Sequence, residues 1–283
     1  MLPTAHTRDG LALHLREWPV AKAHGSVLIV HGLGEHIGRY AHVAAALNAQ
    51  RWRVVGYDLR GHGASAGPRG VITQADDLLA DLARVIDALR EEASRGPLVL
   101  LGHSMGGLVA ARFVAEDLVP AARRATWARE VDALVLSSPA LNLGMKAVQK
   151  LLLAVLGALA PELALGNGLR PEWISRDVQV VAAYRADPQV HDRIAPRLAR
   201  FMVDAGVFVR AQAQGWAVPT LLLYAGSDRC VAPAGSAAFA EAAPKGVVTS
   251  RAFEPLFHEI FNEPEQAEVF AALSKWLSSA PGN

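Results

Sequence analysis

The sequence has little cysteine, no excess of either charge and no long uninterrupted apolar run. Only one of its 283 residues is a cysteine, Cys230, which excludes an intramolecular disulfide and fits a reducing compartment. The 28 basic and 27 acidic residues are dispersed and leave a formal net charge of +1, so no basic stripe predicts nucleic-acid binding. The start of the chain lacks the basic and apolar regions of a secretory signal. We therefore expect a cytoplasmic protein.

Apolar residues are plentiful, at 52% of the chain, which is enough to bury a large core. Apolar runs typical of strands alternate with helical patterns, and neither an internal repeat nor a low-complexity tract interrupts them. The expected strands are residues 11–17, 26–31, 53–58, 97–102, 131–137, 219–225 and 246–253, and the expected helices are residues 40–51, 75–94, 105–118, 232–243 and 264–278. This alternation predicts an α/β fold with a mainly parallel sheet covered by helices on both faces.

The pentapeptide GHSMG, residues 102–106, lies between one of these strands and the next helix. A serine flanked by glycines at this spacing is typical of a nucleophile elbow, a strained strand-to-helix turn that exposes the hydroxyl of Ser104. The free N–H groups and positive dipole end of the following helix favour a developing negative charge there. G-x-S-x-G alone is common by chance, so the interpretation depends on this context and on Gly107, which allows close helix packing.

A serine nucleophile needs a histidine base and an orienting acid, and both follow Ser104 in the chain. Asp228 lies just after the expected strand 219–225, and His258 lies in a loop after the strand 246–253. Loops at the carboxyl ends of parallel strands are where such side chains converge. We therefore predict the catalytic residues Ser104, Asp228 and His258.

Other histidines and one aspartate compete for these roles. Four histidines precede the serine and are expected to have structural or packing roles: His31, His36, His62 and His103. His191 lies in a charged, helical stretch and is expected to be solvated. Asp58 ends a strand before the serine and is followed by turn residues, so we interpret it as ordering its loop.

The oxyanion hole of such an elbow uses two backbone N–H groups. One is that of Met105, the residue after the nucleophile. The second should come from a loop after an earlier strand, and HGLGEH (residues 31–36) follows the expected strand 26–31 with two glycines that let the backbone fold toward the serine. The N–H of Leu33 is the natural donor there, although a simple strand-ending turn is the alternative interpretation.

Five motifs in chain order carry a resemblance to a known family: HGLGEH (31–36), GYDLRGHG (56–63), GHSMGG (102–107), GSD (226–228) and FHEIFNE (257–263). Together they resemble the monoacylglycerol lipase and lysophospholipase group of α/β-hydrolases over nearly the whole chain. Epoxide hydrolases and haloalkane dehalogenases share that fold but carry an aspartate at the elbow, so Ser104 argues against both. The resemblance implies that Glu35 and Arg39 help shape the polar end of a substrate pocket.

An ion pair that orders the loop is an equally good interpretation of Glu35 and Arg39. We include His103 as a third candidate substrate-binding residue, although its side chain is expected to point away from the hydroxyl. Cys230 follows Asp228 by two residues and is expected to pack passively against the site wall. The spacing of cysteine and histidine predicts no metal cluster.

More than seventy residues, from about 140 to 215, contain no convincing strand. An insertion of this length, rich in apolar helical segments, is typical of a cap over an active site. We predict an α/β-hydrolase core in residues 1–139 and 216–283 and a helical cap in residues 140–215, called the cap segment below. Its segments 176–186 and 191–210 look like an outer wall. Its apolar run, residues 147–160, is shorter than the about 20 residues that span a bilayer.

Two interpretations of residues 147–160 stay open, because they can pack on the core or, as the resemblance implies, contact lipid transiently. The whole pattern predicts a serine hydrolase of carboxylic esters that needs no cofactor, with a small ester or lipid as its partner. The resemblance points to monoacylglycerols, with lysophospholipids and simple esters as alternatives. An acyltransferase and a ligand receptor without turnover are further alternatives. No oligomeric state is predicted.

Overall fold

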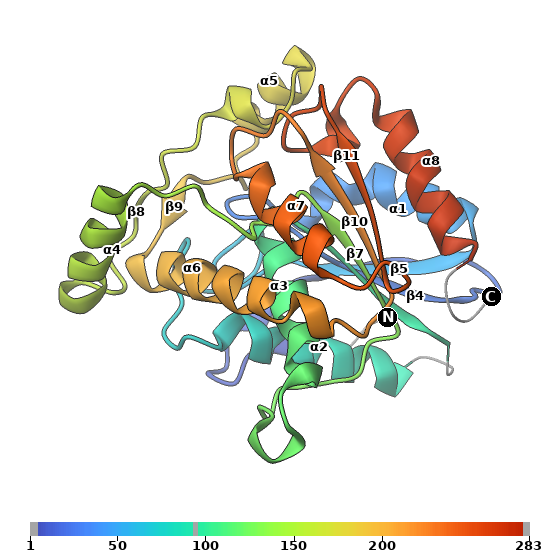
Figure 1. The fold of residues 1–283 in the computed structure, drawn as a ribbon, viewed down its shortest axis with the longest axis horizontal. Helices are drawn as coiled ribbons and strands as arrows, with labels where there is room; N and C mark the ends of the chain where they lie inside the picture. The colour runs from blue at the N-terminus through green and yellow to red at the C-terminus, as the bar shows by residue number, and fades with distance from the viewer. Residues whose placement is uncertain (1–4, 93–95, 280–283) are drawn as a thin grey trace.

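A seven-stranded sheet forms the centre of the computed structural model, which describes residues 5–92 and 96–279 (Figure 1). The strand order is β11-β10-β7-β6-β4-β5-β3. The strands are β3 (Leu15–Trp18), β4 (Gly25–Val30), β5 (Trp52–Tyr57), β6 (Leu98–His103), β7 (Ala133–Ser137), β10 (Thr220–Ala225) and β11 (Val248–Phe253). All neighbours pair in parallel except β3, which is antiparallel to β5. The prediction of a mainly parallel sheet is confirmed.

Helices cover both faces of this sheet, because alternate residues of each strand face opposite sides. In β4, Val27 and Ile29 belong to the apolar cluster that contains α1 and α8. Leu28 and Val30 belong to the cluster on the other face, with α2, α3, α6 and α7. These helices are α1 (Ala41–Ala49), α2 (Asp77–Glu92), α3 (Ser104–Val114), α6 (Pro196–Ala211), α7 (Pro233–Ala242) and α8 (Gln266–Leu277).

The observed bounds differ from the predicted ones mainly at helix and strand ends. The expected strand 11–17 is split into β2 (Ala12–Leu13), which pairs with β1 (Ala5–His6), and β3. The expected helix 105–118 becomes α3 followed by η2 (Ala115–Leu118), and residues 93 and 94 of the expected helix 75–94 lie outside the described residues. Four further short helical turns are η1 (Ile37–Tyr40), η3 (Ala121–Arg123), η5 (Ala213–Gly215) and η6 (Ile260–Asn262).

The cap segment contains α4 (Ala147–Leu159), β8 (Leu165–Gly166), η4 (Pro171–Trp173), α5 (Val178–Ala186), β9 (Arg193–Ile194) and α6. The antiparallel β8–β9 pair was not predicted, because two residues are too few to show a strand periodicity. The interpretation of residues 191–210 as an outer wall is wrong for α6. Its side chains Leu198, Phe201 and Val209 are buried in the same core as α3.

Helix α4 is the opposite case, since none of its residues is buried. Its exposed apolar side chains are Val148, Leu151, Leu152, Val155 and Leu159. Figure 1 shows α4 projecting from the side of the molecule, away from the central sheet. Within residues 5–92 and 96–279, no helix is both long enough and apolar enough to cross a membrane.

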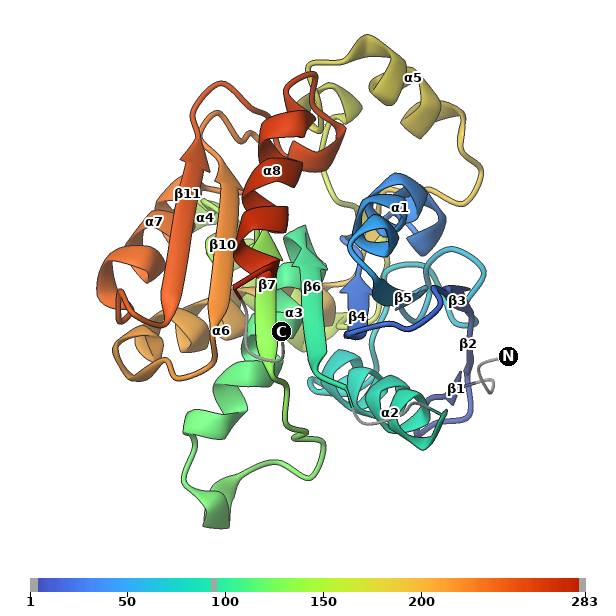
Figure 2. The same cartoon turned by 90° about the vertical axis from the view of Figure 1, so that its right-hand side faces the viewer.

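The parallel strands place four loops at one edge of the sheet. Residues 31–36 follow β4, Ser104 follows β6, Asp228 follows β10 and His258 follows β11. Figure 2 shows α5 of the cap segment above this edge, toward which the arrows of β6, β10 and β11 point. Carboxyl-terminal edges of open α/β sheets are where ligands bind.

Candidate active site

Ser104 occupies a strained turn between β6 and α3. Its φ is +53°, in a region that residues with side chains rarely adopt. A β-carbon at Gly102 would lie 2.5 Å from the carbonyl oxygen of Gly106, and one at Gly106 would overlap the carbonyl oxygen of Val30. Both positions therefore require glycine. This is the geometry predicted for a nucleophile elbow.

Ser104, His258 and Asp228 form a continuous chain of hydrogen bonds. His258 Nε2 lies 2.8 Å from Ser104 Oγ, and His258 Nδ1 lies 2.7 Å from Asp228 Oδ2. The second carboxylate oxygen, Asp228 Oδ1, accepts hydrogen bonds from the backbone N–H groups of Cys230 at 2.8 Å and Val231 at 3.0 Å. With Asp228 fixed by its own loop, His258 Nδ1 carries the proton and Nε2 faces the hydroxyl as an acceptor.

The charges around His258 favour its protonated form. Burial by itself would lower the pKa of His258, but the charge and hydrogen bond of Asp228 outweigh it, and the pKa is raised above its ordinary value. The charges of Glu259 and Glu35 act in the same direction. The imidazole is therefore a stronger proton acceptor than a free histidine.

The loop after β4 passes directly beside the serine. A β-carbon at Gly32 would lie 3.1 Å from Ser104 Cβ, and the next residue, Leu33, lines the same cavity as Ser104. Met105 is the second residue of α3, where backbone N–H groups have no partner within the helix. The two predicted oxyanion donors thus belong to segments that meet at Ser104, and their role stays a prediction.

A cavity of about 440 Å³ opens on Ser104 and His258. Its floor comes from the loops at the sheet edge, and its roof comes from the cap segment. The roof residues are Asn167, Leu169, Arg170, Pro171, Ile174, Tyr184, Arg185, Asp187, Val190, His191 and Asp192. The wall is therefore mixed, with apolar side chains beside charged ones.

Comparisons with known proteins place this geometry in a family. The Hydrolase_4 family model, described as serine aminopeptidase, S33, matches residues 21–265. The chain belongs to this family. It is 34% identical to a monoacylglycerol lipase of Mycolicibacterium smegmatis over 92% of this chain and 90% of that protein. It is 30% identical to the phospholipase YtpA of Bacillus subtilis, over 90% of this chain and 95% of that protein.

A solved structure agrees with these relatives. The monoacylglycerol lipase of Paleococcus ferrophilus superimposes with a TM-score of 0.82 at 33% identity, over 94% of this chain and 98% of that one. The predicted resemblance to the monoacylglycerol lipase group and the predicted α/β-hydrolase fold are confirmed. This member of the Hydrolase_4 family is a carboxylic ester hydrolase.

Glu35 and Arg39 belong to a buried ionic network in this hydrolase. Arg39 Nη1 lies 2.8 Å from Glu35 Oε2 and 2.6 Å from Glu259 Oε1, and Arg39 Nη2 lies 2.7 Å from Glu259 Oε2. Glu35 Oε1 accepts hydrogen bonds from the N–H of Gly32 at 2.6 Å and from Tyr40 Oη at 2.7 Å. Burial would raise the pKa of Glu35, but the opposing interactions, of which the charge of Arg39 is the largest, together lower the pKa to about 2.

This network joins the loop that contains Leu33, the predicted oxyanion donor, to the loop that contains His258, the predicted base. Glu35 and Glu259 line the cavity, whereas Arg39 lies behind them with its guanidinium 4.8 Å from the ring centre of Tyr184. The geometry therefore agrees with both interpretations of the Glu35–Arg39 pair. Glu35 forms part of the cavity wall, and its bonds to Arg39 and Gly32 order the loop.

His103 lines the cavity beside His258, with the two ring centres 4.8 Å apart. Its Nδ1 lies 3.1 Å from Ser137 Oγ, so the ring is anchored away from the hydroxyl of Ser104. Burial, together with the charge of His258, lowers the pKa of His103 to about 4. A neutral His103 leaves His258 as the charged imidazole of this pair at acidic pH.

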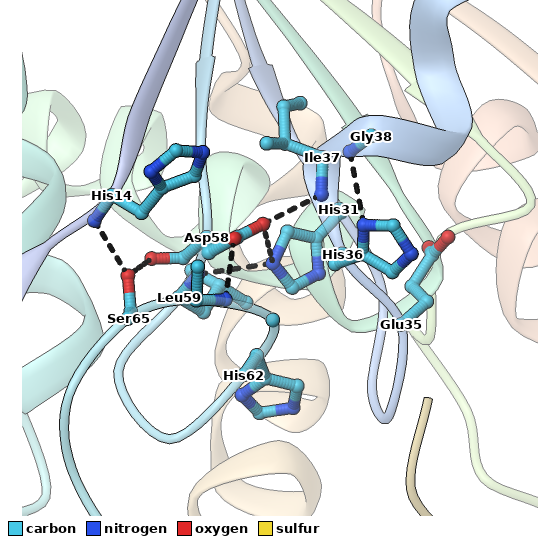
Figure 3. Close-up of polar contacts among 12 residues, drawn as sticks. His14, His31, Glu35, His36, Ile37, Gly38, Asp58, Leu59, His62 and Ser65 are labelled. Atoms are coloured by element: carbon cyan, nitrogen blue, oxygen red, sulfur yellow. Dashed lines mark hydrogen bonds and ion pairs between the residues drawn. The ribbon is translucent and has the colours of Figure 1, made fainter. Parts of the chain in front are cut away.

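Asp58 orders the turn that follows β5, as Figure 3 shows. Its Oδ1 accepts a hydrogen bond from the N–H of Ile37 at 2.7 Å, and its Oδ2 accepts one from the N–H of Ala64 at 2.8 Å. Beside it, His31 Nε2 accepts a hydrogen bond from the N–H of Leu59 at 3.0 Å. Both side chains therefore hold backbone in place, in agreement with the structural roles predicted for them.

His191 is only partly exposed, so the prediction that it is solvated is wrong. It precedes β9 in a loop, lines the cavity, and packs its ring 4.6 Å from that of His62. Burial lowers the pKa of His191 to about 4, and its Nε2 is buried without a hydrogen-bond partner among the described residues. Asp192 and Arg193, which follow it, are exposed. The exposure that the charged neighbours suggested holds for the side chains of Asp192 and Arg193, whereas the His191 ring packs against His62.

Cys230 lines the cavity close to two of the predicted catalytic residues. Possible ligand atoms of Asp228, Cys230 and His258 lie within 4.8 Å of one another. Asp228 and His258 are already hydrogen-bonded to each other, and burial raises the pKa of the Cys230 thiol, so the thiolate that a metal ion would need is disfavoured. These residues do not fit a metal site.

Sequence reasoning missed Glu259, Tyr184 and the other cap residues of the cavity wall. Glu259 could have been found, because it directly follows His258 and a buried guanidinium with several N–H donors can pair with a second acid besides Glu35. Tyr184 gave no signal, since it lies in a helix of mixed composition, 79 residues after Met105 and 151 residues after Leu33. Its place in the wall depends on how α5 folds back over the sheet edge.

Proposed function

We propose that this hydrolase converts monoacylglycerols to a fatty acid and glycerol through an acyl-enzyme on Ser104. The observation that carries the proposal is the hydrogen-bonded series Ser104–His258–Asp228 at the floor of a cavity with apolar and polar walls. The names of the relatives support the substrate class, because the Mycolicibacterium and Paleococcus proteins are both monoacylglycerol lipases.

In the first half of the reaction, Ser104 Oγ attacks the ester carbonyl while His258 Nε2 takes its proton. Asp228 stabilises the imidazolium, and the N–H groups of Leu33 and Met105 hold the oxyanion. The imidazolium then gives its proton to the leaving alcohol. In the second half, His258 removes a proton from water, which attacks the acyl-enzyme and releases the acid. Neither half requires a cofactor.

The glycerol end of the substrate is assigned to the polar wall. Glu35 offers its carboxylate to the cavity with Arg39 neutralising it from behind, and His103 closes the wall beside His258. Carboxylate oxygens accept hydrogen bonds from glycerol hydroxyls. The acyl chain is assigned to the apolar side of the cavity beneath the cap segment, residues 140–215, which we propose acts as a cap.

A phosphate-bearing lipid is the second candidate substrate. Arg170 lines the cavity and is exposed, and among the described residues it has no acidic partner within ion-pair distance. A guanidinium is well suited to a phosphate group. The Bacillus relative is a phospholipase, which supports this alternative.

Helix α4 is the part of the cap that we propose contacts a lipid surface transiently. Its exposed apolar residues include Val148 and Leu159, at 77% and 79% exposure. An apolar helix of 13 residues on the outside of a protein buries its surface favourably in the acyl boundary of a membrane. The cytoplasmic location expected from the sequence stays a prediction.

The test is hydrolysis of 1-monoacylglycerols, lysophosphatidylcholines and a p-nitrophenyl ester series from acetate to palmitate, each with the wild type and Ser104→Ala. Turnover of long-chain monoacylglycerol that the substitution abolishes supports the proposal. A preference for the lysophospholipid that Arg170→Gln removes favours the second candidate. Activity confined to short esters would indicate a general carboxylesterase. Activity that survives Ser104→Ala would contradict the mechanism.

A further inference from the structure

Glu263 is a buried carboxylate that joins two segments far apart in the chain. On the cap side, its Oε1 accepts hydrogen bonds from Ser175 Oγ at 2.7 Å and from the N–H of Arg176 at 2.6 Å. Its Oε2 accepts a hydrogen bond from Arg176 Nε at 2.6 Å and another from the N–H of Phe257 at 2.9 Å. Four donors therefore converge on one side chain with 0% exposure.

These contacts hold the loop of the predicted base on both sides of His258. Phe257, the residue before it, is held by Glu263. Glu259, the residue after it, donates its N–H to the carbonyl oxygen of Ile174 at 2.8 Å. Glu263 thus fixes the backbone before His258 directly. The backbone after His258 is fixed by Ile174, whose neighbour Ser175 is bound by Glu263.

We propose that Glu263 is a positioning residue that couples the cap segment to the placement of His258. The inference rests on the proposed function, because it assumes that His258 activates Ser104. With the Glu263 bonds in place, the imidazole lies 2.8 Å from Ser104 Oγ. A shift of the loop by about 1 Å is enough to lower the rate of such a reaction on the order of a hundredfold.

A carboxylate is needed at this position because all four partners are donors. An amide has one oxygen that accepts and one nitrogen that only donates, so Glu263→Gln keeps the size but turns an N–H group toward two donors. Glu265 supplies a matched control. It pairs with Arg176 from the exposed side and, among the described residues, makes no hydrogen bond to Phe257.

The experiment compares the wild type with Glu263→Gln and Glu265→Gln. It measures kcat and KM on p-nitrophenyl butyrate, the rate of covalent inactivation by a fluorophosphonate, and thermal unfolding. We expect Glu263→Gln to lower kcat and the inactivation rate together, by about ten- to a hundredfold, with KM within about twofold. Glu265→Gln should leave kcat, KM and the inactivation rate within about twofold of the wild type, since only the contact on the exposed side of Arg176 is changed.

A folded Glu263→Gln variant with wild-type kcat and inactivation rate would overturn the inference, whatever its unfolding temperature. An equal loss of kcat in Glu265→Gln would also overturn it, because the effect would then belong to Arg176. If Glu263→Gln does not fold, Ser175→Ala decides, since it removes one cap donor and leaves the carboxylate in place. We expect a loss of kcat of about threefold with KM unchanged, and no loss would refute the coupling.

The proposed function and the role of Glu263 can be refuted independently of each other. If the wild type hydrolyses no ester, or if Ser104→Ala keeps its activity, the proposed mechanism falls before the Glu263 variants are compared. If Ser104→Ala is inactive while Glu263→Gln matches the wild type, only the role of Glu263 is refuted.

Discussion

Replacing Arg39 by methionine should destabilise the protein strongly, because it leaves two buried carboxylates without their cation. Arg39 makes three ionic hydrogen bonds of 2.6 to 2.8 Å, and the side chains of Arg39, Glu35 and Glu259 are only 12%, 5% and 7% exposed. Removing one partner of a buried ion pair costs about 3–5 kcal/mol. At roughly 2 °C per kcal/mol for a domain of this size, the melting temperature should fall by about 6–10 °C.

The assay is thermal unfolding at neutral pH, with Arg200→Met as the control. Arg200 also pairs with a carboxylate, that of Asp204 at 2.6 Å, but the two side chains are 62% and 57% exposed. An exposed pair of this kind contributes about 0.3–0.5 kcal/mol, so the control should melt within about 1 °C of the wild type. Adding Glu35→Gln and Glu259→Gln to Arg39→Met should recover part of the loss, since the uncompensated charges are removed.

The loss should also depend on pH. Against the effect of burial, the interactions of Glu35, of which the charge of Arg39 is the largest, lower its folded-state pKa to about 2 from an ordinary value of 4.5. A depressed carboxyl pKa contributes stability that is present above pH 4.5 and is lost as the pH falls toward 2. The difference between the wild type and Arg39→Met should therefore shrink over this interval. Equal melting temperatures for Arg39→Met and Arg200→Met, or a difference that grows below pH 4.5, would refute the reasoning.

Two further predictions concern the reaction and the lipid surface. The charge of Asp228 raises the pKa of His258, and the base must be neutral, so kcat/KM of the wild type should fall as the pH drops through a value above 6.5. Asp228→Asn should lower the rate about 10⁴-fold and move this acidic limb to lower pH, and a limb that does not move would contradict the assignment of the base. Leu159→Glu on α4 should reduce hydrolysis of monoacylglycerol in phospholipid vesicles about tenfold while sparing p-nitrophenyl butyrate. Val207→Glu, at an exposed position of α6, is its control, and equal losses in both variants would exclude a specific contact through α4.

The predicted catalytic residues could be read from the sequence because each follows an apolar strand-like run. Parallel strands end at one edge, so Ser104, Asp228 and His258 had to meet if the strands were assigned correctly. The bond from Arg39 to Glu259 could not be read in this way, since it joins loops 220 residues apart with no pattern that links them. Glu263 was visible only as a member of the motif FHEIFNE, and three of its four donors lie in the cap segment.

The cap segment was the least predictable part. Its strands β8 and β9 have two residues each, and α6 carries charged residues on a helix whose other face is buried in the core. His191 was misjudged for a related reason, because local composition reports the average exposure of a stretch and not the direction of one side chain. In both cases the tertiary contact decides, and it involves residues remote in sequence.

The sequence of helix α4 should have little effect on the packing of the core, because α4 contributes no buried side chain to the core. Substitutions along its outer face should change colloidal behaviour, such as the concentration at which the purified enzyme self-associates, without altering the packing around the sheet. For the same reason, we expect that α4 can be replaced by the corresponding helix of a relative. A helix transplanted from a more polar relative would bring its own surface chemistry and leave the hydrolytic machinery at the strand ends in place.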